Sequence, residues 1–239
     1  MQTIAVVSAK GGVGKSTFCT EVGKGLAARR KQVLLVDMDI GVRSLDLLLG
    51  VAEKVVYNWG DVLLGNCDVR KALLRAPCGV WLLPAPLRFS DGFTAEAFAA
   101  LLEPLKKDCD FMLLDSPAGM ETGFRLSAAC AESCVFVTTP DAVSVRAAAN
   151  AARTVRGMTD ATLLLAVNRY DKKVHRAFCA DDTVDTVGAR LVGVVPECDA
   201  VYAAAGGGYV SPESKGGAAF RRIARRLCGE QVPFRMKLL

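Results

Sequence analysis

The sequence has a single histidine, His175, and none of its nine cysteines forms a C-x-x-C pair. Both deficits argue against a zinc site, because structural zinc needs closely spaced cysteine and histidine ligands. We expect the cysteines to be small, mostly apolar side chains that stay reduced inside a cell. His175 lies in a polar segment without a neighbouring nucleophile, so it carries no catalytic signal and is expected to be solvated.

Long apolar stretches are missing as well. No basic-then-apolar leader precedes the first strand-like segment, and no apolar run approaches the ~20 residues that span a bilayer. We therefore expect a cytoplasmic protein. Aromatic residues are few (7%) although half of the chain is hydrophobic (51%), which is typical of a Val-, Leu- and Ala-rich parallel sheet. No repeat or linker divides the chain, so residues 1–239 are predicted to form one domain.

Acidic residues are scarce near the C-terminus. From Lys215 to the last residue, seven basic residues accompany one acid, Glu230, whereas the formal net charge of the whole chain is +5. Basicity is therefore a property of the C-terminal segment, where residues 229–239 form a short basic tail.

The most informative segment that is present reads KGGVGKST and occupies residues 10–17. It lies between an apolar segment typical of a buried strand and a segment with a helical pattern. Backbone N–H groups of such a glycine loop bind phosphate together with the positive end of the helix dipole. Lys15 would reach the β- and γ-phosphates, and the Ser16 hydroxyl would bind Mg²⁺. A plain glycine-rich turn with two surface lysines is the alternative, which the fixed spacing argues against.

The loop departs from the strict pattern G-x-x-x-x-G-K-[ST], because its first position is Ala9. It carries instead a second lysine, Lys10, five residues before Lys15. At that spacing Lys10 lies on the outer rim of the loop, too far round to duplicate Lys15. We predict that it reaches a nucleotide held by another subunit.

Strand-like and helix-like patterns alternate along the chain. Strands are predicted at residues 3–8, 32–37, 80–83, 111–115, 134–138, 162–168 and 191–195. Helices are predicted at residues 16–30, 94–107, 123–131, 144–158, 181–187 and 217–227, with helical turns near 45–49 and 59–64 and a helix end and flexible turn at 203–208. This alternation predicts an α/β fold with a doubly wound, mostly parallel sheet flanked by helices on both faces, which binds ligands at the carboxyl ends of its strands.

Three acids follow apolar strands at that edge. Alternation along the strand would put Asp37 and Asp39 on the same side, where one could hold magnesium through water and the other could orient the attacking water. A cap of the next turn is the alternative for this pair. Asp115 ends a strand as the magnesium-supporting acid of P-loop enzymes does. Residues 116–119 are predicted to form a compact turn that senses the γ-phosphate.

Asn168 ends another apolar strand. Its amide could pair with the edge of adenine, or it could form an Asx turn. The residues by themselves leave both interpretations open.

Together these features resemble the deviant Walker A ATPases, the MinD/ParA family of P-loop ATPases with a SIMIBI-type fold. The resemblance covers nearly the whole chain in order. Besides the loop it is carried by residues 37–46, 55–57, 115–123, 143–146, 191–197 and 226–230. The segments at 40–46 and 116–119 place the chain nearest the septum-determining branch of that family.

The resemblance implies a homodimer that forms on ATP binding and hydrolyses ATP slowly until a partner stimulates it. The residues that would bind ATP and Mg²⁺ are Gly11, Gly12, Val13, Gly14, Lys15, Ser16, Thr17, Asn168 and Pro196. Asp39 would orient the water, while Asp37 and Asp115 would support the outer shell of the metal. Lys10 would act across the dimer as an arginine finger does. The implied partners are a MinE-like activator and a MinC-like inhibitor.

The resemblance is weakest at the C-terminus, where the family usually has a membrane-binding amphipathic helix. Only six residues follow Pro233, fewer than the ~12–15 that an isolated helix needs in water. Basic and apolar residues are nevertheless mixed there. A weak, mostly electrostatic and ATP-dependent contact with the inner face of the membrane is therefore one hypothesis, and a solvated, truncated tail is the other.

Division-site placement is thus the first functional hypothesis. A ParA-type DNA-segregation ATPase and an FlhG-like regulator of flagellar number are the alternatives. The C-terminal arginines favour DNA binding, whereas the nearly neutral remainder of the chain argues against a nucleic-acid partner. No cysteine closely follows Asp115, which argues against an iron–sulfur carrier.

Overall fold

The computed structural model describes the whole chain except residues 91, 175–178, 206–209 and 235–239. His175, the turn expected to end near residue 208 and the last five residues of the basic tail therefore lie outside the described residues. No helix in the described part of the chain is both long and apolar enough to cross a membrane.

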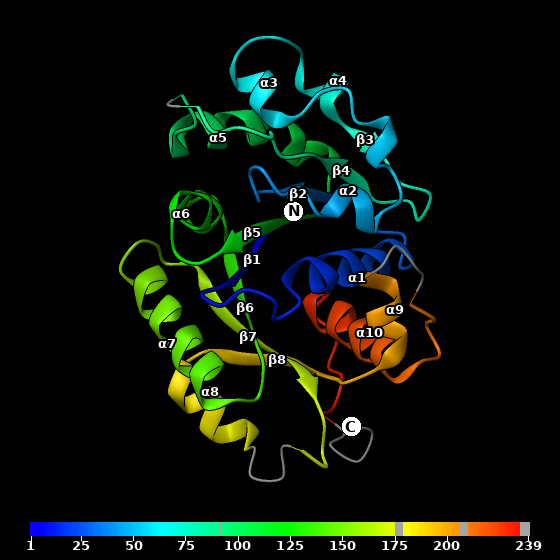
Figure 1. Ribbon diagram of the computed structural model, residues 1–239, viewed down its shortest axis with the longest axis vertical. Coiled ribbons are helices and arrows are strands. Elements are labelled where there is room, and N and C mark those ends of the chain that lie inside the picture. The colour runs from blue at the N-terminus through cyan, green and yellow to red at the C-terminus, as the bar shows by residue number, and fades with distance from the viewer. Residues whose placement is uncertain (91, 175–178, 206–209, 235–239) are drawn as a thin grey trace.

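An eight-stranded sheet runs through the centre of the molecule (Figure 1). Neighbouring strands are parallel except β3, which pairs antiparallel with β4. In spatial order the strands are β3 (Leu74–Arg75), β4 (Trp81–Leu83), β2 (Val33–Asp37), β5 (Phe111–Ala118), β1 (Gln2–Ser8), β6 (Ser133–Thr138), β7 (Thr162–Tyr170) and β8 (Arg190–Pro196). The order changes direction around β1, which confirms the doubly wound sheet and places a binding crevice at the carboxyl end of that strand.

Helices cover both faces of the sheet, as predicted. The α-helices are α1 (Lys15–Ala27), α2 (Leu45–Leu48), α3 (Trp59–Leu63), α4 (Val69–Ala72), α5 (Ala95–Leu102), α6 (Thr122–Ala129), α7 (Ala142–Arg156), α8 (Ala180–Val187), α9 (Asp199–Ala205) and α10 (Lys215–Leu227). Two short 3₁₀ helices are η1 (Ala52–Lys54) and η2 (Glu103–Asp108). Figure 1 shows α1, α9 and α10 together on one side and α6, α7 and α8 on the other.

The central strands are apolar throughout because successive side chains pack into different cores. Val33 and Leu35 of β2 belong to the core beneath α1 and α10. Leu34 and Val36 belong to the opposite core, which also contains Phe98 of α5. Alternation in a strand with helices on both sides therefore needs hydrophobic residues at every position.

The predicted helix at 94–107 is wrong in its second half. The α-helix α5 ends at Leu102, and the 3₁₀ helix η2 follows with Pro104 near its start. Proline has no N–H to donate and its ring crowds the preceding turn, so it fits the start of a new helical segment better than the interior of an old one.

The predicted strand at 111–115 is too short. β5 continues to Ala118, because the ladder with β1 resumes after a bulge between Val6 and Ser8 and pairs Ser8 with Ala118. The compact turn expected at 116–119 therefore begins only at Gly119, whose φ of 90° suits glycine.

Candidate functional site

The loop between β1 and α1, residues 9–14, lies at the crevice beside the carboxyl end of β1 and is here called the glycine cradle. Gly12 and Gly14 have φ angles of 74° and 92°, in the left-handed region that glycine adopts without strain. Gly14 is the N-cap residue of α1, and neither a capping side chain nor an acid occupies the first turn. The N–H groups at the start of α1 therefore receive no side-chain acceptor, as in an anion site.

Two charged side chains are buried next to the cradle. Lys15 is 8% exposed and Asp115 is inaccessible to solvent. Burial lowers the pKa of Lys15, although Asp115 and Asp39 act in the opposite direction. Burial and the charge of Asp37 raise the pKa of Asp115 to about 8. These shifts describe an ammonium and a carboxylate that both lack sufficient solvation.

Asp115 also lacks partners. The Ser16 hydroxyl lies close enough to oppose the rise in the pKa of Asp115, yet neither carboxylate oxygen has a hydrogen-bond partner among the described residues. An unsatisfied buried carboxylate is costly. Its position beside Ser16 fits a group that accepts hydrogen bonds from the water shell of Mg²⁺, because this ion usually keeps several waters.

Asp37 lies next to Asp115, since β2 and β5 pair these residues in register. Its oxygens are engaged: Oδ1 accepts the N–H of Asp39 (2.9 Å) and Oδ2 accepts the N–H of Leu45 (3.0 Å). Burial raises the pKa of Asp37 to about 6. Asp37 thus caps the following turn, which is the alternative that the sequence left open. Each oxygen keeps a second lone pair for a metal-bound water.

Asp39 lies in the turn beyond the strand, because β2 ends at Asp37. Strand alternation therefore does not apply to this pair, although the charge of Asp39 acts on both Asp37 and Asp115. Asp39 is half-buried, and this burial raises its pKa while Lys15 lowers it. It is therefore the more accessible of the three acids and faces the Lys15 charge.

Two supporting residues were not singled out from the sequence. The Ser44 hydroxyl donates to Ser16 Oγ (3.0 Å) and links the segment before α2 to the expected metal ligand. The indole Nε1 of the fully buried Trp59 donates to the main-chain oxygen of Asp37 (2.8 Å). Ser44 falls in the 40–46 segment of the family resemblance, which is the signal that could have found it. Trp59 carried no such signal.

Asn168 makes a contact that neither sequence interpretation included. It is 3% exposed, and its side-chain Nδ2 donates to the main-chain oxygen of Val13 (2.7 Å). A Cβ atom on Gly14 would lie 2.3 Å from this nitrogen. Asn168 therefore holds the glycine cradle against the end of β7, and the cradle admits no side chain there.

A small cavity of about 40 Å³ adjoins this contact, and Thr17, Asn168 and Pro196 all contribute to its lining. The structure thus brings Asn168 and Pro196, both expected to bind ATP, together with Thr17 at the start of α1. The guanidinium of Arg169 lies over the Tyr202 ring at the same cavity, 5.2 Å from the ring centroid. Arg169 and Tyr202 were not predicted to belong to the site.

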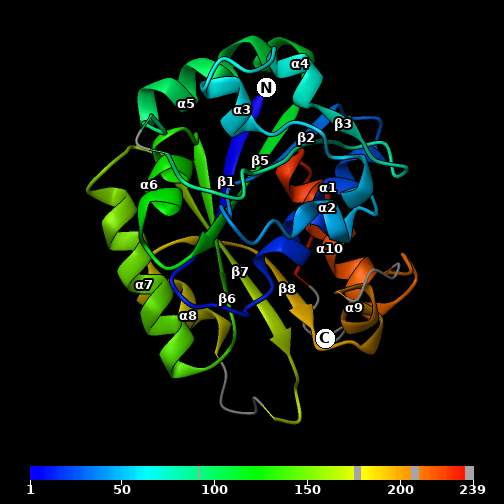
Figure 2. The same cartoon turned by 45° about the horizontal axis from the view of Figure 1, so that its top comes forward.

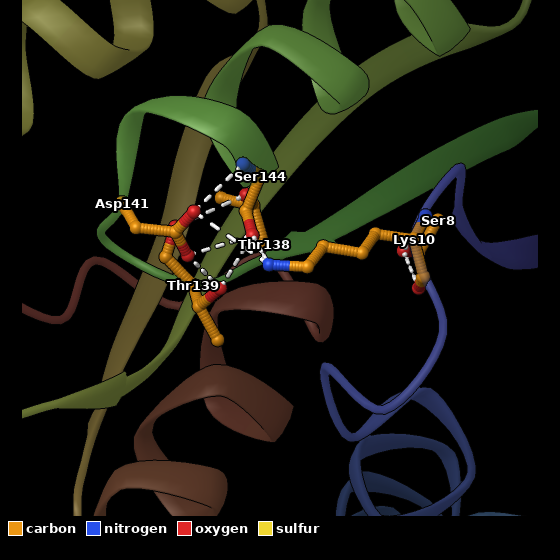
Figure 3. A network of polar contacts seen from close by, with 6 residues as sticks. All are labelled: Ser8, Lys10, Thr138, Thr139, Asp141 and Ser144. Atoms are coloured by element: carbon orange, nitrogen blue, oxygen red, sulfur yellow. Dashed lines mark hydrogen bonds and ion pairs between the residues drawn. The ribbon is translucent and has the colours of Figure 1, made fainter.

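Lys10 points toward Asp141 and Ser144 at the start of α7 (Figure 3). Its Nζ donates to Ser144 Oγ (2.9 Å) and lies 3.6 Å from Asp141 Oδ1. Thr139 and Ser144 donate to the carboxylate of Asp141 (2.6 and 2.7 Å). Partial burial acts to raise the pKa of Asp141, but these hydrogen bonds outweigh it and lower that pKa. Lys10 therefore ends in a polar network on the outer side of the loop.

Comparison with known proteins agrees with this geometry. The ParA family described as "NUBPL iron-transfer P-loop NTPase" matches residues 1–168. The septum site-determining protein MinD of Synechocystis sp. is 37% identical, over 97% of this chain and 91% of that protein. MinD of Escherichia coli K12 is 34% identical, over 97% and 93%.

Solved structures are similar as well. The MinC:MinD cell division protein complex of Aquifex aeolicus superposes with a TM-score of 0.90 at 32% identity, covering 98% of both chains. MinD of Pyrococcus horikoshii complexed with Mg-ADP gives a TM-score of 0.86 at 27% identity, covering 95% of both chains. Its ligand is a magnesium nucleotide, the class for which the glycine cradle, Lys15 and Asp115 are suited. This chain belongs to the MinD/ParA family of P-loop ATPases.

Proposed function

We propose that this chain is an ATP-dependent dimerisation switch that takes part in placing the division septum. The observation that carries the proposal is that a buried ammonium, Lys15, and a buried carboxylate without a hydrogen-bond partner in the described residues, Asp115, both lie beside the glycine cradle. The names of the relatives, septum site-determining proteins, support the cellular role.

Different residues in and beside the glycine cradle bind the phosphates and Mg²⁺. N–H groups at residues 11–17 and the Lys15 ammonium neutralise the β- and γ-phosphates. The Ser16 hydroxyl binds Mg²⁺, and Asp37 and Asp115 accept hydrogen bonds from its waters. When bound, the metal supplies positive charge to the phosphate oxygens. ATP itself is the substrate of this site.

Asp39 orients the attacking water. It is half-buried and held in the turn after β2, close enough to Lys15 for the two charges to affect each other's pKa. Phosphoryl transfer through a loose transition state needs positioning and charge neutralisation more than a strong base. A carboxylate fixed beside the phosphate cradle meets that requirement.

On the base side, Asn168 and Pro196 border the adenine. One Nδ2 proton of Asn168 is used on Val13, which leaves its other proton and its oxygen for the base. Thr17 connects this cavity to the phosphate side.

The surface around the site supports pairing with a second copy. Exposed apolar side chains follow the carboxyl ends of four parallel strands, at the edge that holds the cradle; they are Val42, Leu87, Phe89, Met120 and Val143. An apolar rim at one edge is typical of an interaction surface. Lys10 lies on the same edge and would reach the phosphates of the partner.

Three further partners are proposed from the relatives. The Aquifex aeolicus complex supports a MinC-like inhibitor. A MinE-like activator is proposed from the family resemblance alone. A weak contact with an anionic membrane would place the dimer at the inner face of the cell membrane.

Size-exclusion chromatography with ATP and with ADP tests the switch. The parent chain is expected to elute as a dimer with ATP and as a monomer with ADP. Lys15→Ala removes the ammonium group that neutralises the β- and γ-phosphates. The variant is expected to stay monomeric with either nucleotide. An ATP-loaded parent that remains monomeric at all protein concentrations contradicts the proposal.

A further inference from the structure

A second concave surface lies far from the nucleotide site, between α1 and α10. The two helices lie side by side in both views (Figures 1 and 2) and are in direct contact. A groove of about 740 Å³ runs along them, floored in part by the small residues Gly25, Ala28 and Ala218. Its rim carries four arginines: Arg29, Arg221, Arg222 and Arg225.

The positive charge of this groove is only partly neutralised. Glu230 forms ion pairs with both Arg29 and Arg225. Arg221 and Arg222 have neither an ion pair nor a hydrogen bond among the described residues. The nearby acid Glu213 accepts a hydrogen bond from Ser211 (2.7 Å), and this bond together with the charge of Arg221 lowers the pKa of Glu213, although the two side chains form no ion pair in the described part of the chain.

The two unpaired arginines also crowd each other. Arg222 is partly buried. This burial is the main cause that lowers the pKa of Arg222, and the charge of Arg221 lowers it further. Two adjacent guanidinium groups of like charge are stabilised when an anion with several oxygen atoms binds between them. Phosphate esters have that geometry.

An apolar group is fixed beside the groove. Arg226 donates to the main-chain oxygens of Val192 (3.0 Å), Val232 (2.9 Å) and Pro233 (3.1 Å). Its guanidinium also lies over the ring of Phe234, 3.9 Å from the centroid, and this ring is 46% exposed. The C-terminal segment is therefore held so that the Phe234 ring lies against Arg226, one residue beyond Pro233, which lines the groove.

This combination favours a membrane over a nucleic acid. Clustered arginines serve both partners, but an exposed aromatic ring next to them suits the boundary between headgroups and acyl chains. The sequence after Phe234 continues with Arg, Met, Lys, Leu and Leu, which again mixes basic and apolar side chains.

We propose that the α1–α10 groove binds the phosphate groups of anionic phospholipids through Arg221 and Arg222, with Phe234 entering the interface. This inference rests on the membrane contact proposed for the switch, and it locates that contact at residues of the folded domain. The groove lies at the C-terminal end of α1, a helix of 13 residues and thus about 20 Å long, so the nucleotide edge at the other end stays free for a second copy. A dimer presents two grooves, which strengthens binding without new contacts.

Vesicle sedimentation tests the site on the full chain loaded with ATP. Phosphatidylglycerol–phosphatidylcholine vesicles are compared with phosphatidylcholine vesicles, at low and high salt. Arg221→Gln/Arg222→Gln is expected to bind the anionic vesicles roughly 30-fold more weakly, from about 1 kcal/mol per arginine near the surface. The matched control Arg146→Gln/Arg153→Gln removes two exposed arginines from α7 in the opposite helix layer and is expected to bind like the parent.

Two readouts separate the causes of a failure. ATP-dependent dimerisation and circular dichroism of the α10 variant are expected to match the parent, because neither arginine touches the nucleotide site. If the Arg221→Gln/Arg222→Gln variant binds anionic vesicles as well as the parent does, the groove is not the lipid site, while the membrane contact itself stands. If the parent does not bind anionic vesicles, both the groove site and the membrane contact are overturned, but the proposed dimer switch is not affected.

The same variants distinguish other phosphate sources. Duplex DNA or inorganic phosphate that binds the parent through Arg221 and Arg222, without any vesicle binding, overturns the lipid assignment. Phe234→Ala is expected to reduce binding to anionic vesicles and to leave the salt dependence unchanged, because it removes no charge.

Discussion

At the residue scale, Asp37 and Asp115 set the electrostatics of the site. They are fully buried neighbours on paired strands, and the pKa values of both are raised, to about 6 and about 8. A buried acid with a raised pKa binds its proton more tightly in the folded chain than in the unfolded one. The nucleotide-free protein therefore loses stability as pH rises from about 4 toward 8.

This pair predicts proton release on ligand binding. The positive charge of Mg²⁺ favours the ionised carboxylates, so binding of Mg²⁺ with nucleotide near pH 7 is expected to release protons, mainly from Asp115. Calorimetry in buffers of different ionisation enthalpy measures the number released. Asp115→Asn is expected to release fewer protons and to flatten the fall in unfolding free energy between pH 4 and 8. Proton uptake by the parent contradicts this account.

Asp39 predicts a separation of binding from turnover. Asp39→Ala removes the group that orients water, while Lys15 and the cradle remain. We expect ATP binding and dimerisation to persist and the hydrolysis rate to fall roughly 100-fold or more. Phosphate release under single-turnover conditions measures it. An Asp39→Ala chain that hydrolyses ATP at the parent rate removes this residue from its role.

The residues also show how far the sequence could lead. Lys15 and Ser16 were placed from one short segment, because the loop that positions them is local. Asn168 was placed at the right edge of the sheet, but its bond to Val13 joins residues 155 positions apart. The partners of Ser44 and Trp59 likewise depend on tertiary packing, which periodicity does not contain.

At the element scale, the order and type of the long elements were predictable, because both faces of the sheet are covered and every central strand reads as an apolar run. The helical turns predicted near 45–49 and 59–64 match α2 and α3. The shortest elements were not predicted: β3 has two residues and η1 three, too few for a period. The extension of β5 to Ala118 depends on a bulge in β1, which lies more than 100 residues earlier in the chain.

The packing of α10 on β8 gives a prediction at this scale. A Cβ on Gly193 would lie 2.3 Å from Cγ1 of Ile223, a fully buried side chain. Gly193→Ala therefore overpacks this contact and is expected to cost about 1–3 kcal/mol. Urea unfolding measures the loss. Gly157→Ala is the control, because its Cβ meets ordinary contacts at 3.5 Å and more, and an equal loss there contradicts the packing argument.

At the scale of the whole molecule, the nucleotide edge and the α1–α10 groove lie at opposite ends of α1. One end collects the glycine cradle, three acids, Lys10 and an apolar rim. The other end collects arginines and the held C-terminal segment. The fold thus separates the proposed dimer surface from the proposed lipid-binding groove, and α1 connects the two.

This arrangement predicts that Lys10 matters only in the assembly. Lys10→Ala is expected to keep nucleotide binding to the monomer, because its side chain points toward α7, but to lose ATP-driven dimerisation and turnover. Light scattering and a nucleotide-binding titration measure the two properties. Lys107→Ala, which removes an exposed lysine elsewhere, is the control. Full dimerisation of the Lys10 variant would exclude the exchange of lysines between subunits.

The position of Lys10 also sets how easily such an exchange begins. Its side chain is 45% exposed and that of Asp141 is 43% exposed, so their attraction is worth at most about 1 kcal/mol. Thermal motion breaks a contact of that size many times during one encounter between chains. Release of Lys10 also breaks its hydrogen bond to Ser144 (2.9 Å), but the Lys10 side chain is exposed to water in both contacts. In the proposed dimer, collision and nucleotide loading would therefore limit the rate of association more than the release of Lys10 does.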